Sequence, residues 1–89
     1  MMISEKEIVD IADDYLLTYV GNLIASGIPF FNSKERMWIV PIFHASSNKT
    51  FPLDEMKLSE NGVIAYAPSR EKLIELAKSL TKTTVMHQN

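Results

Sequence analysis

The stretch MWIVPIFHA, residues 37–45, decides the fold, because it has the composition of a β-strand. β-branched and aromatic residues dominate it, and the turn-forming segment SSNK, residues 46–49, follows directly. Pro41 lies inside the stretch and has no N–H to donate to a neighbouring strand. We therefore expect this strand to lie at a sheet edge or to contain a bulge.

Both faces of this strand carry apolar side chains. An antiparallel strand with one face in water would alternate apolar with polar residues. Here the alternating positions are Met37, Ile39 and Phe43 on one face, and Trp38, Val40 and Ile42 on the other. Residues 63–66 repeat this pattern, with Val63 and Ala65 against Ile64 and Tyr66. We therefore expect both faces of the sheet to be covered.

Further strands are predicted on both sides of this stretch. The dipeptide FF, residues 30–31, is a short apolar segment that precedes it. Residues 51–53 begin a strand that follows it, and the change of inward parity there predicts a kink at residues 54–55. The sheet is therefore expected to be an antiparallel meander of three to four strands.

The dipeptide NG, residues 61–62, predicts a two-residue hairpin turn, because both residues tolerate positive φ. This turn would join a strand over residues 56–58 to one over residues 63–67. In that register the inner face holds Met56, Leu58, Val63 and Ala65, and the outer face holds Lys57 and Tyr66.

A long amphipathic helix is predicted over residues 5–25. Ser4 and Glu7 form a capping box at its start, while Gly27 and Pro29 provide the stop signals at its end. Gly21 lies inside this range and marks either a close packing contact or a premature break. The helical period places one apolar arc at Ile8, Val9, Ala12, Tyr15, Leu16, Tyr19, Val20 and Leu23.

A second, shorter helix is predicted after Pro68, with Ser69 as its N-cap. Its buried stripe is Leu73, Leu76, Ala77 and Leu80. Residues 83–89 have no partner in the pattern and are expected to be a frayed tail. The predicted fold class is α+β: one domain over residues 1–82, with a helix, an antiparallel sheet and a second helix in two layers.

Composition excludes several classes of function. The 89 residues include no cysteine, so disulfides, thiolate metal sites and cysteine nucleophiles are excluded. The net charge of −2 argues against a nucleic-acid surface. The start shows no signal-peptide pattern, and the longest apolar run, residues 37–43, is far shorter than the roughly 20 residues of a membrane span. We therefore expect a cytoplasmic protein that does not bind membranes.

Two clusters contain residue types that occur in chemical sites, but neither has the pattern of one. Asp10, Asp13 and Asp14 share a helix but supply too few oxygen ligands for a hard cation, so no metal site is predicted. His44 lies near Ser46, Ser47 and Asp54 in the sequence, but proximity along the chain does not make a catalytic triad. Glycine-rich phosphate loops are also absent from the sequence, and we expect no cofactor and no catalytic residues.

The function favoured by the sequence is a non-enzymatic binding or assembly module. The apolar sheet face predicted as its interface carries Trp38, Val40, Ile42 and Tyr66, and the partner is a second copy or another protein. One alternative is a small-ligand pocket, or a weak enzyme site, between the first helix and the sheet, lined by Tyr15, Tyr19 and Trp38 with His44 at its mouth. The other is an acidic regulatory partner of the immunity or antitoxin type, acting through Asp10, Asp13 and Asp14.

Overall fold

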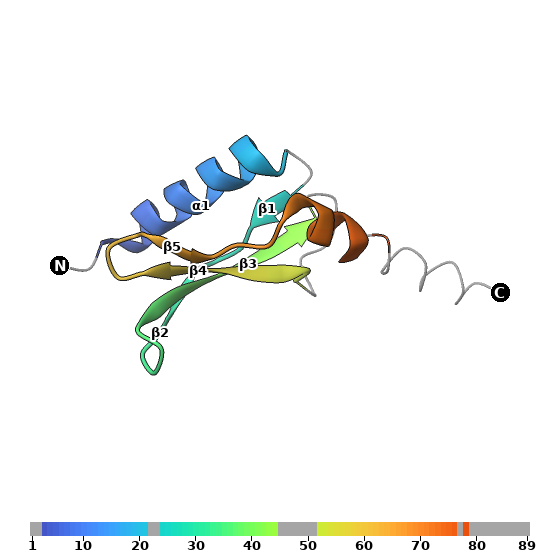
Figure 1. Ribbon diagram of the computed structural model, residues 1–89. Helices are drawn as coiled ribbons and strands as arrows, with labels where there is room; N and C mark the ends of the chain where they lie inside the picture. The colour runs from blue at the N-terminus through green and yellow to red at the C-terminus, as the bar shows by residue number, and fades with distance from the viewer. Residues whose placement is uncertain (1–2, 22–23, 45–51, 77, 79–89) are drawn as a thin grey trace.

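The computed structural model describes residues 3–21, 24–44, 52–76 and 78 (Figure 1). The elements are α1 (Glu5–Tyr19), β1 (Ile24–Ser26), β2 (Phe30–Asn32), β3 (Met37–His44), β4 (Asp54–Ser59) and β5 (Ile64–Tyr66). A C-terminal helix follows, described over residues 70–76 and at 78. All five strands belong to one antiparallel sheet, and α1 lies across it, so the predicted α+β class is confirmed.

Some predicted features fall outside the described residues. They are the turn at 46–49, the start of a strand at residue 51, the tail at 83–89, and the buried positions Leu23, Ala77 and Leu80. Within the described ranges, no helix has both the length and the apolar character needed to cross a membrane.

β3 is a central strand, not an edge strand. The break in strand pairing that Pro41 requires lies in the neighbouring edge strand, not in β3. β1 and β2 pair with the two halves of β3 on one side, and β4 pairs along the other side. Ser26 lies opposite Ile42 and Phe30 opposite Ile39, so three residues, 27–29, span the width of two. β1 and β2 are thus one edge strand with a bulge-like break opposite Pro41.

α1 ends at Tyr19, so the predicted helix over residues 5–25 was six residues too long. Gly21 has a φ of +121°, which glycine adopts without strain, and its N–H donates to the carbonyl oxygen of Leu16 at 2.8 Å. The chain turns there, and Ile24–Ser26 pairs with β3 as β1. Gly21 is therefore the premature break, and Gly27 lies in the edge strand, where its N–H donates to the carbonyl oxygen of Pro41.

The β4–β5 hairpin has the predicted glycine turn but a different register. Gly62 has a φ of +86°, and the turn is closed by hydrogen bonds from Gly62 N–H to Ser59 and from Ser59 N–H to Val63. This loop is longer than two residues, so Leu58 lies opposite Ile64. A bulge follows, and Lys57 lies opposite Tyr66. Val63 and Ala65 are exposed, which corrects their predicted inner position.

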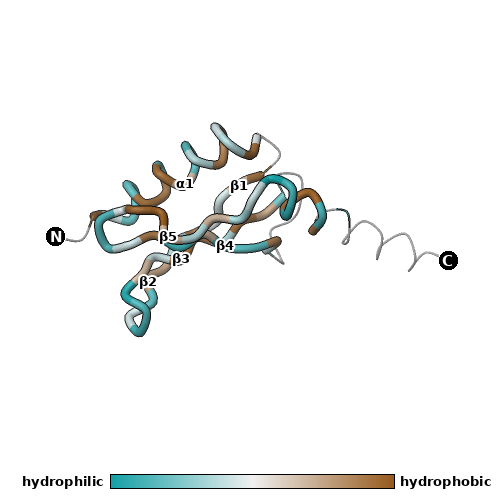
Figure 2. The backbone as a smooth tube through the Cα atoms, in the orientation of Figure 1, coloured by the Kyte–Doolittle hydropathy of each residue, from teal (hydrophilic) through white to brown (hydrophobic). Residues whose placement is uncertain are grey.

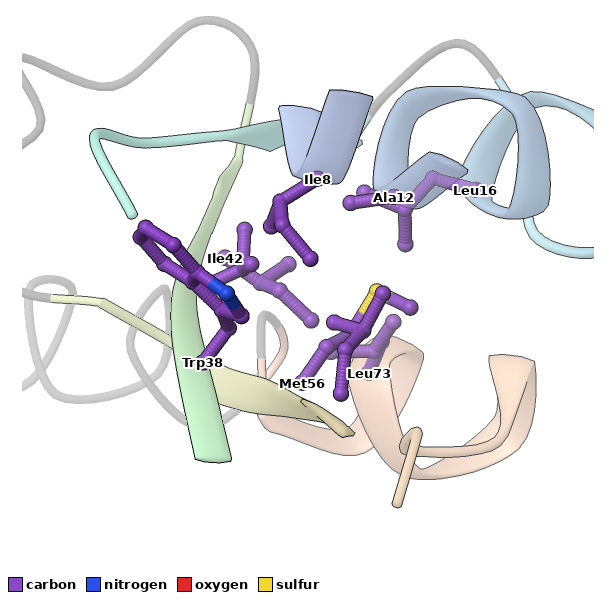
Figure 3. Close-up of a cluster of buried hydrophobic side chains, with 9 residues drawn as sticks. Ile8, Ala12, Leu16, Trp38, Ile42, Met56 and Leu73 are labelled. Carbon is purple, nitrogen blue, oxygen red and sulfur yellow. The ribbon is translucent and has the colours of Figure 1, made fainter. Parts of the chain in front are cut away.

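The core occupies one side of the sheet, between the strands and α1 (Figure 3). Its buried members are Ile8, Ala12 and Leu16 from α1, Trp38, Val40 and Ile42 from β3, Met56 and Leu58 from β4, and Leu73 from the C-terminal helix. Both helices therefore contribute to the same apolar layer. Hydrophilic residues gather instead at the tip of the β2–β3 hairpin (Figure 2).

Candidate functional site

The side of the sheet opposite this core is called the outer face here. Residues that pair across antiparallel strands project to the same side. The pairing registers therefore place Phe30, Ile39 and Lys57 in one row across β2, β3 and β4, and Tyr66 on β5 lies opposite Lys57 next to a bulge. Pro41 and Glu55 form the next row. Among the described residues, Phe30, Ile39 and Pro41 neither belong to the core cluster nor pack against it, whereas Tyr66 contacts Lys72 of the C-terminal helix.

The outer face is apolar and partly exposed. Phe30 is 55% exposed and Tyr66 is 38% exposed, whereas Ile39 between them is buried. Ile28, in the break between β1 and β2, is 81% exposed and lies two residues from Phe30. Single exposed apolar side chains are common, but contiguous apolar patches on a monomer mark interaction sites.

Phe43 extends this face toward the end of β3. It is buried, and it lies opposite Ala25 on β1. Gly27 approaches its ring so closely that a Cβ atom on that glycine would lie 2.6 Å from Phe43 Cε2. The edge strand therefore packs closely against Phe43 at Gly27.

The charges on the outer face lie around Lys57. Its Nζ is 3.1 Å from Glu35 Oε2, and this hydrogen bond, followed by the charge of Glu35, raises the pKa of Lys57. Glu55 projects to the same side, two residues along β4, and forms no ion pair with any described residue. The face thus combines one lysine with two carboxylates, an unfavourable charge balance for a phosphate or a nucleic acid.

Tyr66 is fixed by a clasp, defined here as Asp54, Tyr66 and Lys72. The Tyr66 hydroxyl donates to Asp54 Oδ2 at 3.1 Å, and Lys72 Nζ donates to the Tyr66 oxygen at 2.9 Å. Lys72 Nζ is also 3.1 Å from Asp54 Oδ2, and these contacts, led by the one to Tyr66, raise the pKa of Lys72. The clasp connects the C-terminal helix to β4 and β5 and holds the Tyr66 side chain in place.

The predicted interface of Trp38, Val40, Ile42 and Tyr66 is not a single uncovered face. The first three are buried in the core beneath α1, whereas Tyr66 is partly exposed on β5 and is hydrogen-bonded to Asp54 and Lys72. This prediction was made without knowledge of the β3–β4 register, in which Trp38 lies opposite Leu58 and Val40 opposite Met56. β4 alternates apolar Met56 and Leu58 with charged Glu55 and Lys57, and this alternation is the signal that separates the two faces.

The alternative ligand pocket would lie between α1 and the sheet. Its tyrosines stack on one another, with ring centroids 4.9 Å apart, but Tyr15 is half-buried and Tyr19 is exposed. Trp38 is part of the core, and its indole nitrogen faces the cluster with no hydrogen-bond partner (Figure 3). His44 is half-buried and lies opposite Ile24 at the end of β3. Of the four residues predicted to form the pocket, Trp38 belongs to the core cluster and Tyr15 packs against it.

The acidic residues of α1 have separate positions. Asp13 accepts a hydrogen bond from the Ser26 hydroxyl and so connects α1 to β1, whereas Asp10 and Asp14 are exposed. The described part of the chain contains no group of three histidine, cysteine or acidic residues placed to hold a metal ion.

No protein-family model, no curated protein and no solved structure matches this chain.

Proposed function

We propose that this chain is a non-enzymatic protein-binding module that docks a partner on its outer face. The observation that carries the proposal is exposed Phe30 beside buried Ile39 on this face, with the partly exposed ring of Tyr66 at the β5 edge of the sheet. Aromatic residues at the centre of a patch supply much of the binding energy in protein interfaces.

The outer face is also pre-organised for docking. Phe30 and Ile39 are paired strand residues, and the clasp restrains Tyr66 through Asp54 and Lys72. Side chains that are already ordered lose less conformational entropy when a partner binds. This arrangement supports docking on a rigid surface in place of folding around a partner.

The opposite face is a poor docking surface. Trp38, Val40 and Ile42 are covered by α1, so a partner that used them would first have to displace that helix. Displacement would expose Ile8, Ala12 and Leu16 to water, which opposes it by the free energy of burying those side chains.

A photo-crosslinking residue placed at position 30 tests the proposal in the producing cells, with position 17 as the matched control. Leu17 is 67% exposed on α1, which lies on the other side of the sheet. We expect a discrete crosslinked product, defined by mass, from position 30 and none from position 17. Equal products from both positions, or none from either, would contradict docking on the outer face.

A further inference from the structure

We infer that the occupant of the outer face is a second copy of this chain. The two outer faces stack on each other so that the two β4 strands run antiparallel. This inference rests on the proposed function and specifies its partner. Two-fold contacts place the same patch of each copy against the other, so the patch must complement itself.

The charges of β4 meet that requirement. Glu55 and Lys57 project to the same side of β4, about 6.8 Å apart for residues i and i+2 of a strand. A two-fold axis that runs across the strands between them brings Lys57 opposite the partner's Glu55 and Glu55 opposite the partner's Lys57. Glu55 has no ion pair among the described residues, so this stacking gives a carboxylate that would otherwise be desolvated a counter-charge.

The apolar residues are consistent with the same axis. It places the row of Phe30, Ile39 and Lys57 over the partner's row of Pro41 and Glu55. Gly27 N–H donates to Pro41, so the break that contains Ile28 lies beside Pro41. Phe30 of one copy therefore approaches the partner's Ile28, and the two exposed apolar side chains of the edge strand cover each other.

The area of the outer face determines how stable we expect the dimer to be. Four strand spacings and a six-residue strand give a plane of about 400 Å² per copy. Standard stable interfaces bury about 800 Å² of accessible surface per partner, which is more than the flat area because side chains protrude. We therefore expect a dimer that dissociates on dilution through the micromolar range, not an obligate one.

Sedimentation velocity of the full chain across a micromolar dilution series tests the inference. We expect a monomer–dimer equilibrium that Lys57→Glu or Glu55→Lys each weakens about tenfold or more through like-charge contact across the axis. The double variant Lys57→Glu with Glu55→Lys exchanges the two charges and should restore the dimer. Leu17→Asp is the control that leaves it unchanged, and thermal melts verify that every variant folds.

Several results would overturn the inference, and they are distinguishable. A double variant that stays as weak as the single variants would contradict the antiparallel stacking of β4. A monomer at every concentration, together with a crosslink from position 30 to a different protein, would overturn self-association and leave the proposed docking face intact. A monomer with no crosslink from position 30 would overturn both.

Discussion

The two faces of this sheet are made from alternate residues of the same strands, yet they differ in how they are covered and how far they are exposed. On the inner face, Trp38, Val40 and Ile42 are buried beneath α1 in a cluster that also includes Leu73 of the C-terminal helix. On the outer face, Ile39 is also buried, while Phe30 beside it remains partly in water. Apolar character alone does not distinguish the two faces; the position of both helices on one side of the sheet does.

The largest expected difference between the faces comes from a charge placed on each. Ile42→Asp buries a carboxylate in the core without a partner, and we expect it to cost more than about 4 kcal/mol or to unfold the chain. Phe30→Asp places the same group on the exposed outer face, where the cost should stay within about 1 kcal/mol. Urea unfolding followed by circular dichroism measures both. Similar losses from the two variants would contradict the assignment of the faces.

Trp38 provides a second test of the inner face, because its indole nitrogen is buried without a hydrogen-bond acceptor. Trp38→Ala should cost about 3–5 kcal/mol through the cavity it leaves. Trp38→Phe also removes volume, but it removes the unsatisfied N–H as well, which returns about 1–3 kcal/mol of desolvation. We therefore expect Trp38→Phe to change the free energy of unfolding by only about 1 kcal/mol. A loss as large as that of Trp38→Ala would show that the N–H has a partner in solution.

Two glycines test how tightly each face is packed. Gly27→Ala would press its Cβ against the buried ring of Phe43 on the outer face, an overpacking that costs about 1–3 kcal/mol. Gly62→Ala should cost roughly 1–2 kcal/mol, chiefly because its φ of +86° disfavours a Cβ atom. Its close contacts, Ile3 Cδ1 and Ile11 Cδ1, are the ends of flexible side chains that can shift. Thermal melts compare the two, and a neutral Gly27→Ala would show that the edge strand is looser than described.

The sequence was sufficient where the signal is local. Ser4 accepts a hydrogen bond from Glu7 N–H at 3.2 Å, as its capping pattern predicts, and Ser69 accepts one from Lys72 N–H at 3.1 Å. The positive φ of Gly62 was predicted from the NG dipeptide. In each case a few adjacent residues satisfy the backbone without help from the rest of the chain.

The sequence was insufficient to predict features that depend on contacts between segments far apart in the chain. The apolar arc of the first helix continues past Gly21 through Leu23, so periodicity alone did not reveal that Ile24–Ser26 would pair with β3. Whether Trp38 lies on the inner or the outer face depended on the β3–β4 register and on which side of the sheet α1 covers. Pairing registers and helix placement are set by tertiary contacts, which no window of neighbouring residues contains.

The smallest expected effect concerns the clasp at the edge of the outer face. Lys72 has a pKa above its ordinary value of 10.5, because Tyr66 and Asp54 favour its charged form. A raised folded-state pKa stabilises the fold below the unfolded value and loses that contribution as the pH rises through the folded value. We therefore expect the melting temperature to fall slightly above pH 10.5, and to fall less in Lys72→Met, in low-salt melts across that range. An equally steep fall in the variant would remove Lys72 as the cause.

The central claim, that the outer face is the docking surface and the inner face is sealed, is tested most directly by dilution followed with amide and indole NMR spectra. The account predicts that cross-peaks of Phe30, Ile39 and Lys57 on the outer face shift together as the protein is diluted through the micromolar range. The indole N–H of Trp38, buried on the inner face, should keep its position throughout. A moving Trp38 signal with fixed outer-face signals would contradict the account.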